Sequence, residues 1–165
     1  MNDNKERKML IQLCYASVRV EGENDLLLDL SDILVTARNF NAENSIFGVL
    51  YYADGSFFQC LEGQVEDVLA LFQKIQQDKR HHQVQQFAIK EISEITFKQW
   101  SMKYVNSNTK IANFFKSIGL NKFEPHHLNS ENIHEFLKIL LKTANIEKPI
   151  KSSMGYQNRG YQNYF

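Results

Sequence analysis

Residues 45–62 read SIFGVLYYADGSFFQCLE and contain two strand-like segments joined by Asp54-Gly55. Segments 45–53 and 56–62 are rich in β-branched and aromatic residues, which favour strands. An Asp-Gly pair between two such segments is a strong signal for a tight β-hairpin. We therefore expect two antiparallel strands here.

Helical and strand-like patterns flank this hairpin on both sides. A strand-like segment at 9–15 precedes a helical pattern at 25–40, in which apolar residues recur three and four residues apart. After the hairpin, a second helical pattern covers 65–78 and a strand-like segment covers 84–92. The order β-α-β-β-α-β predicts an α+β, ferredoxin-like sheet with both helices on one face. A piece at 99–105 is expected to add a last strand.

The chain divides into a main domain and an appendage. We expect an N-terminal arm at 1–8, the sheet domain at 9–105 and a helical appendage at 106–148. The following residues, 149–165, contain GYQN twice and lack core residues, so they are predicted to be a disordered tail. The two short helices expected in the appendage are residues 111–118 and 130–144.

Composition excludes several classes of protein. The 165 residues are 43% hydrophobic and 23% charged, as in ordinary globular proteins. The 19 basic and 19 acidic residues cancel, so we expect no direct nucleic-acid partner. No apolar run of membrane-spanning length or signal-peptide pattern occurs, which predicts a cytoplasmic protein without membrane contact. The two cysteines and the adjacent histidine pairs lack metal-ligand spacing, so no metal is expected.

Strand alternation places a glutamine among apolar side chains on the helix-covered face. Phe57, Gln59 and Leu61 share that face, and Tyr15 on the neighbouring first strand could meet Gln59 there. A buried amide without hydrogen-bond partners costs about 1–3 kcal/mol, so polar partners should face Gln59. A ligand with donors and acceptors along one edge would supply them. The alternative is a closed core in which Gln59 bonds only to Tyr15 or to backbone.

The opposite face of the sheet is also apolar and needs a cover. Its expected residues are Leu10, Cys14, Phe47, Val49, Tyr51, Phe58 and Cys60. Either the two C-terminal helices or a second copy of the chain, in a homo-oligomer, could supply that cover.

Five blocks of sequence occur in order along the chain. They are LCYAS at 13–17, NFNAENSIFGVLYY at 39–52, GSFFQCLEG at 55–63, QDKRH at 77–81 and FKQWSM at 97–102. Together they resemble the BLUF domain, a blue-light-sensing flavin module, and the whole chain resembles the short photoreceptors of that family. The resemblance implies FAD held non-covalently between the two helices, and a sensor rather than an enzyme.

Three polar side chains match residues of the flavin site in that family. Tyr15 matches the photoactive tyrosine, and Gln59 matches the glutamine that links it to N5 and the C4 carbonyl of the flavin. Asn41 matches an asparagine that bonds the pyrimidine edge of the ring. Its residue type alone would favour a helix C-cap instead.

Further matches surround these three residues. Asp78, Arg80 and His81 match a cluster at a helix end that flanks the flavin. The apolar positions that line the pocket are matched by Ile33, Leu50 and Phe57. The pair on the last strand is matched by Trp100 and Met102, which share one face by strand parity.

The resemblance also implies a photochemical function. Tyr15 would donate an electron and a proton, and Gln59 would then reorient or tautomerise and red-shift the flavin absorption until the dark state returns thermally. The signal is expected to pass through the last strand to the C-terminal helices. The expected recipient is a protein partner, by family analogy a transcriptional regulator or another signalling protein.

Two other functions share the predicted order of elements. An RNA-recognition module would need basic residues near its third strand, but Asp54 and Glu62 flank that strand here. A small acylphosphatase-like hydrolase would need a phosphate-binding loop after the first strand, and residues 16–24 contain a single glycine. Both alternatives are therefore disfavoured.

Overall fold

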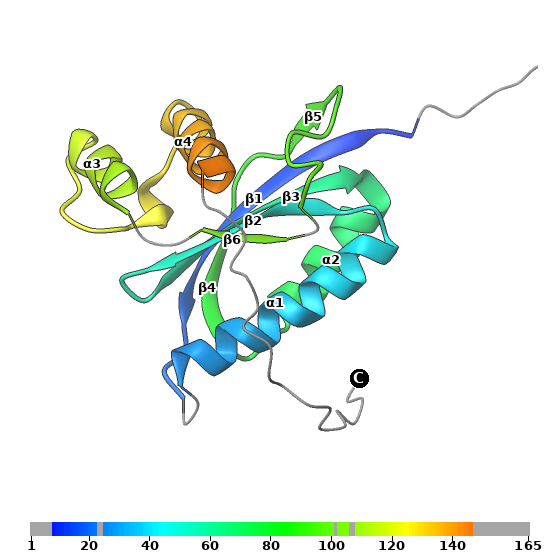
Figure 1. The fold of residues 1–165 in the computed structure, drawn as a ribbon, viewed down its shortest axis with the longest axis horizontal. Coiled ribbons are helices and arrows are strands. Elements are labelled where there is room, and N and C mark those ends of the chain that lie inside the picture. The colour runs from blue at the N-terminus through cyan, green and yellow to red at the C-terminus, as the bar shows by residue number, and fades with distance from the viewer. Residues whose placement is uncertain (1–7, 23–24, 101, 106–107, 147–165) are drawn as a thin grey trace, which may run out of the picture.

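The computed structural model describes residues 8–22, 25–100, 102–105 and 108–146. A single sheet separates two layers of helices (Figure 1). The predicted tail and nearly all of the predicted N-terminal arm lie outside the described residues.

The sheet has the strand order β4-β1-β3-β2-β6, and β5 also pairs with β1. The predicted ferredoxin-like arrangement is confirmed, because β1 and β3 are its central antiparallel strands and the additional β6 runs parallel to β2 at the edge. The strands are β1 (Leu10–Arg19), β2 (Phe47–Ala53), β3 (Ser56–Gln64), β4 (His81–Gln86), β5 (Lys90–Ile92) and β6 (Lys103–Val105).

The turn between β2 and β3 confirms the predicted hairpin. Asp54 and Gly55 both have positive φ, 49° and 81° respectively. Two consecutive residues of this kind form the type I′ turn that matches the twist of paired strands. Asp and Gly suit these positions because both tolerate left-handed backbone.

Helices α1 (Leu26–Glu43) and α2 (Val65–Gln76) cover one face of the sheet (Figure 1). Asp25 caps the start of α1, and its side chain accepts a hydrogen bond from the Leu27 N–H. Val68 and Phe72 of α2 are buried against the sheet, as the predicted apolar stripe requires. This layer also contains Tyr15 and the apolar neighbours of Gln59.

The other face is covered by α3 (Thr109–Ser117), a 3-10 turn η1 (Pro125–His127) and α4 (Asn132–Ile146). Phe136 of α4 is fully buried, and its ring lies 5.0 Å from that of Phe58 on β3 and 6.3 Å from that of Tyr51 on β2. The C-terminal helices therefore pack on the second apolar face. None of the helices in the described part of the chain combines the length and apolar character needed to cross a bilayer.

The strand predicted at 84–92 is two strands, β4 and β5, separated by residues 87–89. The β1–β4 register shifts between Ala16 and Val18, and Gln83 has a positive φ of 51°. Such a bulge bends the strand away from its partner. The Phe87 N–H still bonds the Cys14 carbonyl at 3.0 Å before the chain leaves the sheet. Residue types alone did not reveal this bulge.

Candidate functional site

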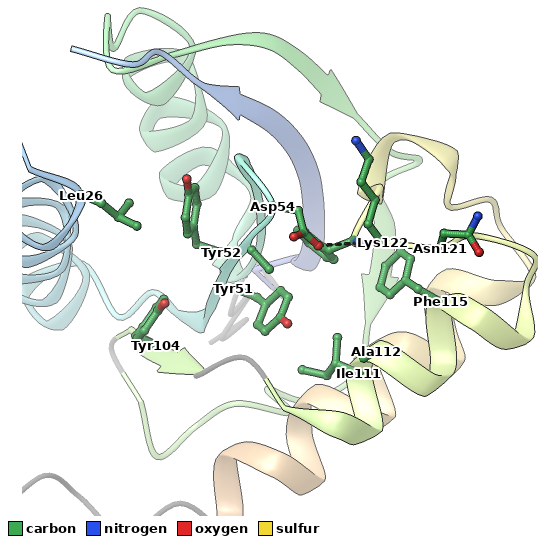
Figure 2. Close-up of a pocket in the computed structure, with 12 residues that line it drawn as sticks. Leu26, Tyr51, Tyr52, Asp54, Tyr104, Ile111, Ala112, Phe115, Asn121 and Lys122 are labelled. Carbon is green, nitrogen blue, oxygen red and sulfur yellow. Dashed lines mark hydrogen bonds between the residues drawn. The ribbon is translucent and has the colours of Figure 1, made fainter.

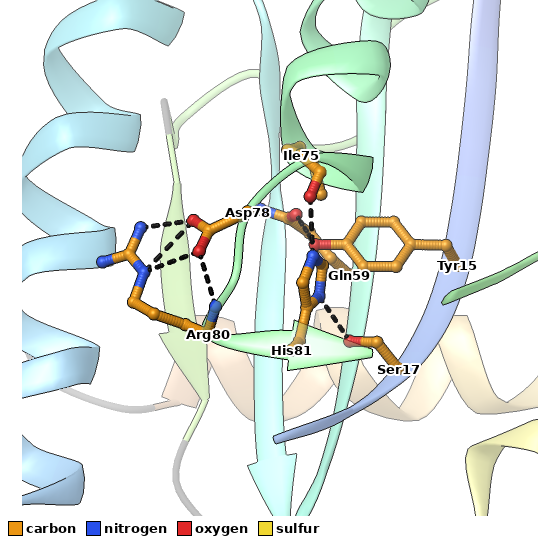
Figure 3. Close-up of polar contacts among 7 residues, drawn as sticks. All are labelled: Tyr15, Ser17, Gln59, Ile75, Asp78, Arg80 and His81. Carbon is orange, nitrogen blue, oxygen red and sulfur yellow. Dashed lines mark hydrogen bonds and ion pairs between the residues drawn. The ribbon is translucent and has the colours of Figure 1, made fainter. Parts of the chain in front are cut away.

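Tyr15 and Gln59 are direct register partners on the central strands β1 and β3. The Tyr15 hydroxyl donates a hydrogen bond to Oε1 of Gln59 at 2.5 Å, and each residue is only 4% exposed (Figure 3). Both side chains lie on the face that α1 and α2 cover. Strand parity allowed Tyr15 and Gln59 to meet on this face, and in the structure they do. The strand register that brings them together could not be predicted from parity.

The amide nitrogen of Gln59 faces a different partner. Nε2 donates to Sδ of Met102 at 3.3 Å, and Met102 is 2% exposed. A thioether sulfur is a weak acceptor, so the amide has one strong and one weak hydrogen bond. Gln59 can therefore exchange its weak bond for a better acceptor at low cost.

The phenol of Tyr15 lies in a dry environment. Its ring centroid is 5.4 Å from that of Phe72 and 6.2 Å from that of His81. Burial raises the pKa of Tyr15 far above its ordinary value, the charge of Asp78 raises it further, and Arg80 opposes the rise. Tyr15 is therefore a neutral hydrogen-bond donor at any physiological pH.

His81 connects β4 to β1 and to the end of α2 (Figure 3). Its Nδ1 lies 2.9 Å from the Ser17 hydroxyl, and its Nε2 lies 2.6 Å from the Ile75 carbonyl oxygen. A carbonyl only accepts, so Nε2 carries the hydrogen. The imidazole edge is thereby held against the Tyr15 ring.

Asp78 and Arg80 form an ion pair just beyond α2. Arg80 Nη2 lies 2.5 Å from Oδ2 of Asp78, Nε reaches both carboxylate oxygens, and the Arg80 N–H donates to Oδ1 at 2.9 Å. Burial raises the pKa of the Asp78 carboxyl, but the hydrogen bonds and charge of Arg80 outweigh it and leave that pKa below its ordinary value. Both side chains remain about one-third exposed.

Asn41 lies near the C-terminal end of α1 and is 1% exposed. Its backbone carbonyl accepts the Ile46 N–H at 2.8 Å, which ties α1 to the start of β2. The C-cap is Asn44, whose Nδ2 bonds the Phe40 carbonyl at 2.8 Å. The alternative interpretation of Asn41 as the helix C-cap is therefore wrong, because α1 continues past it to Glu43.

The packing of α1 fits a flat apolar ligand with a polar edge. Of its 18 residues, all described, only Asp29, Leu30 and Asn41 are buried. The apolar stripe that faces the sheet is only partly buried, although Leu50 and Phe57 beneath it are 2% and 4% exposed. The members of this stripe are Leu26, Ile33, Leu34, Ala37 and Phe40. A flavin would cover these aliphatic walls while the amides of Asn41 and Gln59 answer its polar edge.

A cavity of about 470 Å³ lies elsewhere, at the β2–β3 turn between the start of α1 and α3 (Figure 2). Tyr51, Tyr52, Tyr104 and Lys122 are among the residues that line it. The Asp54 carboxylate accepts the Phe123 N–H at 2.9 Å on one wall. The described residues of this lining include none of the predicted site residues, and the lining shares Leu26 with the apolar stripe of α1.

Trp100 and Met102 do not share a face, which corrects the parity argument. Trp100 packs on the side of the C-terminal helices, with its ring 6.3 Å from that of Phe97. Met102 packs on the side of α1 and α2. Parity fails because β6 begins only at Lys103 and the Trp100 N–H closes a turn onto the Phe97 carbonyl.

Sequence reasoning missed three charged residues near this site. Arg19 and Asp29 form a buried ion pair at 2.8 Å between the end of β1 and the start of α1. Arg38 on α1 donates from Nε to the Met102 carbonyl at 3.0 Å. The sequence offered one signal for the ion pair: Asp29 is an acidic residue within the apolar stripe of its helix. In the described residues, no group of three or more His, Cys, Asp or Glu side chains is placed to hold a metal ion.

The chain is similar to known proteins both in sequence and in structure. The sequence model of the family described as sensors of blue light using FAD, BLUF, matches residues 10–103. The ground-state structure of BlsA is 48% identical, with a TM-score of 0.81, and the match covers 92% of this chain and 100% of that one. The photo-activated state of BlsA is 51% identical, with a TM-score of 0.80 and coverage of 87% and 99%.

More distant relatives are also similar to this chain. BlrB, described as a BLUF protein in its dark state, is 26% identical with a TM-score of 0.70, over 82% of this chain and 97% of that one. The photoactivated adenylate cyclase subunit beta of Euglena longa is 41% identical over 76 residues, or 46% of this chain. The match spans only 9% of that cyclase subunit. The match over residues 10–103, the strand order and the buried Tyr15–Gln59 pair agree, and the chain belongs to the BLUF family of flavin-binding blue-light sensors.

Proposed function

We propose that this chain is a blue-light photoreceptor that binds FAD non-covalently between α1 and α2. The observation that carries the proposal is the buried hydrogen bond from Tyr15 to Gln59, beside a second Gln59 bond to a weak sulfur acceptor. That arrangement gives a switchable amide next to a redox-active phenol.

The residues of this chain suit each part of the cofactor. Asn41 and Gln59 would bond the polar edge of the ring, and the apolar side chains of Ile33, Leu50 and Phe57 would line its faces. The cluster of Asp78, Arg80 and His81 would flank it. FAD rather than FMN is proposed because the family is described by its use of FAD. When bound, the flavin supplies a blue-absorbing ring that becomes a strong oxidant on excitation.

Tyr15 would act as the electron and proton donor. Its phenol stays protonated in the dark, and its hydroxyl hydrogen already points at Oε1 of Gln59. An oxidised phenol is a far stronger acid, so the proton would move along this hydrogen bond. Gln59 would then turn or tautomerise, exchanging its bond to Met102 for a bond to the ring edge. Its return in the dark would restore the original contacts.

The light signal would leave the site through Met102. Met102 immediately precedes β6, and β6 lies beneath the cluster formed by α3 and α4. We propose that the change alters the packing of these helices and thereby a contact with a protein partner, such as a transcriptional regulator, or with a second copy of the chain. Enzyme activity is not part of this proposal, and the expected place of action is the cytoplasm.

An absorption spectrum before and after blue illumination tests the proposal. The purified protein should be yellow, its main visible band should move to the red in light, and the band should return in darkness. Release of the cofactor by denaturation, followed by chromatography, should give FAD. A colourless protein, or a yellow protein whose band does not move, would refute the proposed function.

A further inference from the structure

Glu62 is a fully buried carboxylate, 0% exposed, on the sheet face opposite to Gln59. Its Oε1 accepts from Nε2 of Gln12 at 2.7 Å. Its Oε2 accepts from the Thr96 N–H at 2.6 Å and from the Phe97 N–H at 3.1 Å. These bonds connect β3 both to β1 and to the segment that leads to Met102.

The segment held by Glu62 carries both Trp100 and Met102. Phe97 is 1% exposed, and its carbonyl accepts the Trp100 N–H at 2.9 Å, so fixing Phe97 also fixes the turn at Trp100. Two further contacts hold the segment: Gly48 N–H to the Trp100 carbonyl, and Arg38 to the Met102 carbonyl. Strand β6 itself is only three residues long. These anchors, together with the short pairing of β6 with β2, fix the position of Met102.

A carboxylate suits this anchoring better than an apolar side chain would. Burying a charge costs desolvation free energy, which an apolar side chain of similar size would avoid. A carboxylate oxygen can, however, accept from two adjacent N–H groups in charge-assisted hydrogen bonds. Glu62 thus fixes a loop backbone that has no strand partner at residues 96 and 97.

We propose that Glu62 is a positioning residue for the photochemical switch. By holding the backbone of Thr96 and Phe97, it places Sδ of Met102 against the amide of Gln59 and thereby sets the rate at which the light state returns to the dark state. This role rests on the proposed function, because it concerns the same Gln59 amide.

Glu62→Gln tests the proposal. The variant keeps the size of the side chain but removes its charge, so its single amide oxygen can give the Thr96 and Phe97 N–H groups only neutral hydrogen bonds. We expect the dark-recovery rate constant to change by about threefold or more, because part of the free energy of these charge-assisted hydrogen bonds is lost. The matched control is Gln12→Leu, which removes a bond to Glu62 but leaves the loop contacts; its recovery should stay within about twofold of wild type.

Trp100 provides a readout that needs no flavin. It is the only tryptophan of the chain, and it lies in the anchored segment. Glu62→Gln should make Trp100 fluorescence more accessible to a neutral quencher such as acrylamide, and Gln12→Leu should not. If Glu62→Gln lowered only the overall stability, the melting temperature would fall but the quenching of Trp100 in the folded protein would not change.

A second pair of variants acts from the loop side and leaves Glu62 intact. Thr96→Pro removes the N–H that donates to Oε2 of Glu62, whereas Thr96→Ala keeps it and alters only an exposed side chain. Thr96→Pro should reproduce the effects of Glu62→Gln on recovery and on Trp100, and Thr96→Ala should resemble wild type. This comparison decides the proposal if Glu62→Gln does not fold.

A double variant shows whether Glu62 acts through Met102. If it does, Glu62→Gln should change recovery by less than about twofold in a Met102→Leu background. A full effect in that background, or unchanged recovery and unchanged Trp100 quenching in Glu62→Gln, would overturn the positioning role. A wild-type protein without any light-induced shift would instead refute the proposed function, and the Trp100 measurement would still test the anchor.

Discussion

Trp100 packs beneath the C-terminal helices, whereas Met102, two positions later, packs beneath α1 against the amide of Gln59. The chain thus crosses from one face of the sheet to the other immediately before β6. A displacement of Met102 would be transmitted to Trp100 through a very short length of backbone. This crossing provides a direct connection between the Gln59 amide and the core formed by α3 and α4.

Met102→Leu is expected to change the photocycle, and Trp100→Phe is its matched control on the other face. Leucine fills a similar volume but offers no acceptor to Nε2 of Gln59, so the dark-recovery rate should change by about threefold or more. Trp100→Phe should leave the dark absorption band and the size of the shift unchanged. Flash photolysis with a visible probe beam measures both variants. A large effect of Trp100→Phe on the band position would contradict the assignment of faces.

Gln59→Leu should bind flavin but show no red shift. The substitution removes the amide that would rebond to the ring, and it leaves the buried hydroxyl of Tyr15 without its acceptor. An unsatisfied buried hydroxyl costs about 1–3 kcal/mol, so the variant should also unfold at lower denaturant concentration. Light-minus-dark spectra and urea titration measure the two effects. A normal red shift in this variant would exclude Gln59 as the switch.

Phe136→Ala should detach the C-terminal layer from the sheet. Its ring is fully buried between β2, β3 and α3, and stacks on Phe114 at 5.5 Å. Phenylalanine-to-alanine changes in such cores cost about 3–5 kcal/mol, and Phe136→Leu should cost much less. Chemical denaturation followed by circular dichroism gives both values. Equal stability of Phe136→Ala and wild type would mean that α4 does not pack on this face in solution.

The ion pair of Asp78 and Arg80 should give stability that depends on pH. The folded-state pKa of Asp78 is depressed, so the pair stabilises the fold above the ordinary aspartate pKa of about 3.9 and loses this effect as pH falls through the folded pKa. Because both side chains are partly exposed, Asp78→Asn should cost about 0.5–1 kcal/mol at pH 7. Urea titrations from pH 7 to pH 3 should show wild type and variant converging. A difference that widens at low pH would contradict the sign.

The sequence predicted those features of the fold that depend on local chemistry. Asp54-Gly55 signalled the hairpin, and strand parity placed Tyr15 and Gln59 on one face. The bulge at Gln83 and the crossing at Trp100 were not predictable, because both depend on register and on tertiary contacts rather than on residue type. The contacts of Glu62 with residues 96 and 97 were missed for the same reason, since backbone N–H groups in a loop leave no sequence signal.

The same limit applies to the candidate site. Residue types and spacing, together with the family resemblance, singled out Asn41, Tyr15 and Gln59 as candidate site residues. They could not show that Gln59 donates to Met102 or that Asn44, rather than Asn41, caps α1. Orientation of an amide is a property of its surroundings, so it became visible only in the structure.

The most direct test of the account compares light-minus-dark absorption spectra of wild type and Tyr15→Phe at equal flavin content. The phenylalanine keeps the ring but has no hydroxyl to donate to Gln59, so the variant should remain yellow and lose the reversible red shift entirely. Wild type should shift to the red in light and return in darkness, over repeated cycles. A Tyr15→Phe protein that still shifts to the red, at the same amplitude and with the same recovery, would contradict the claim that the Tyr15–Gln59 hydrogen bond is the light switch.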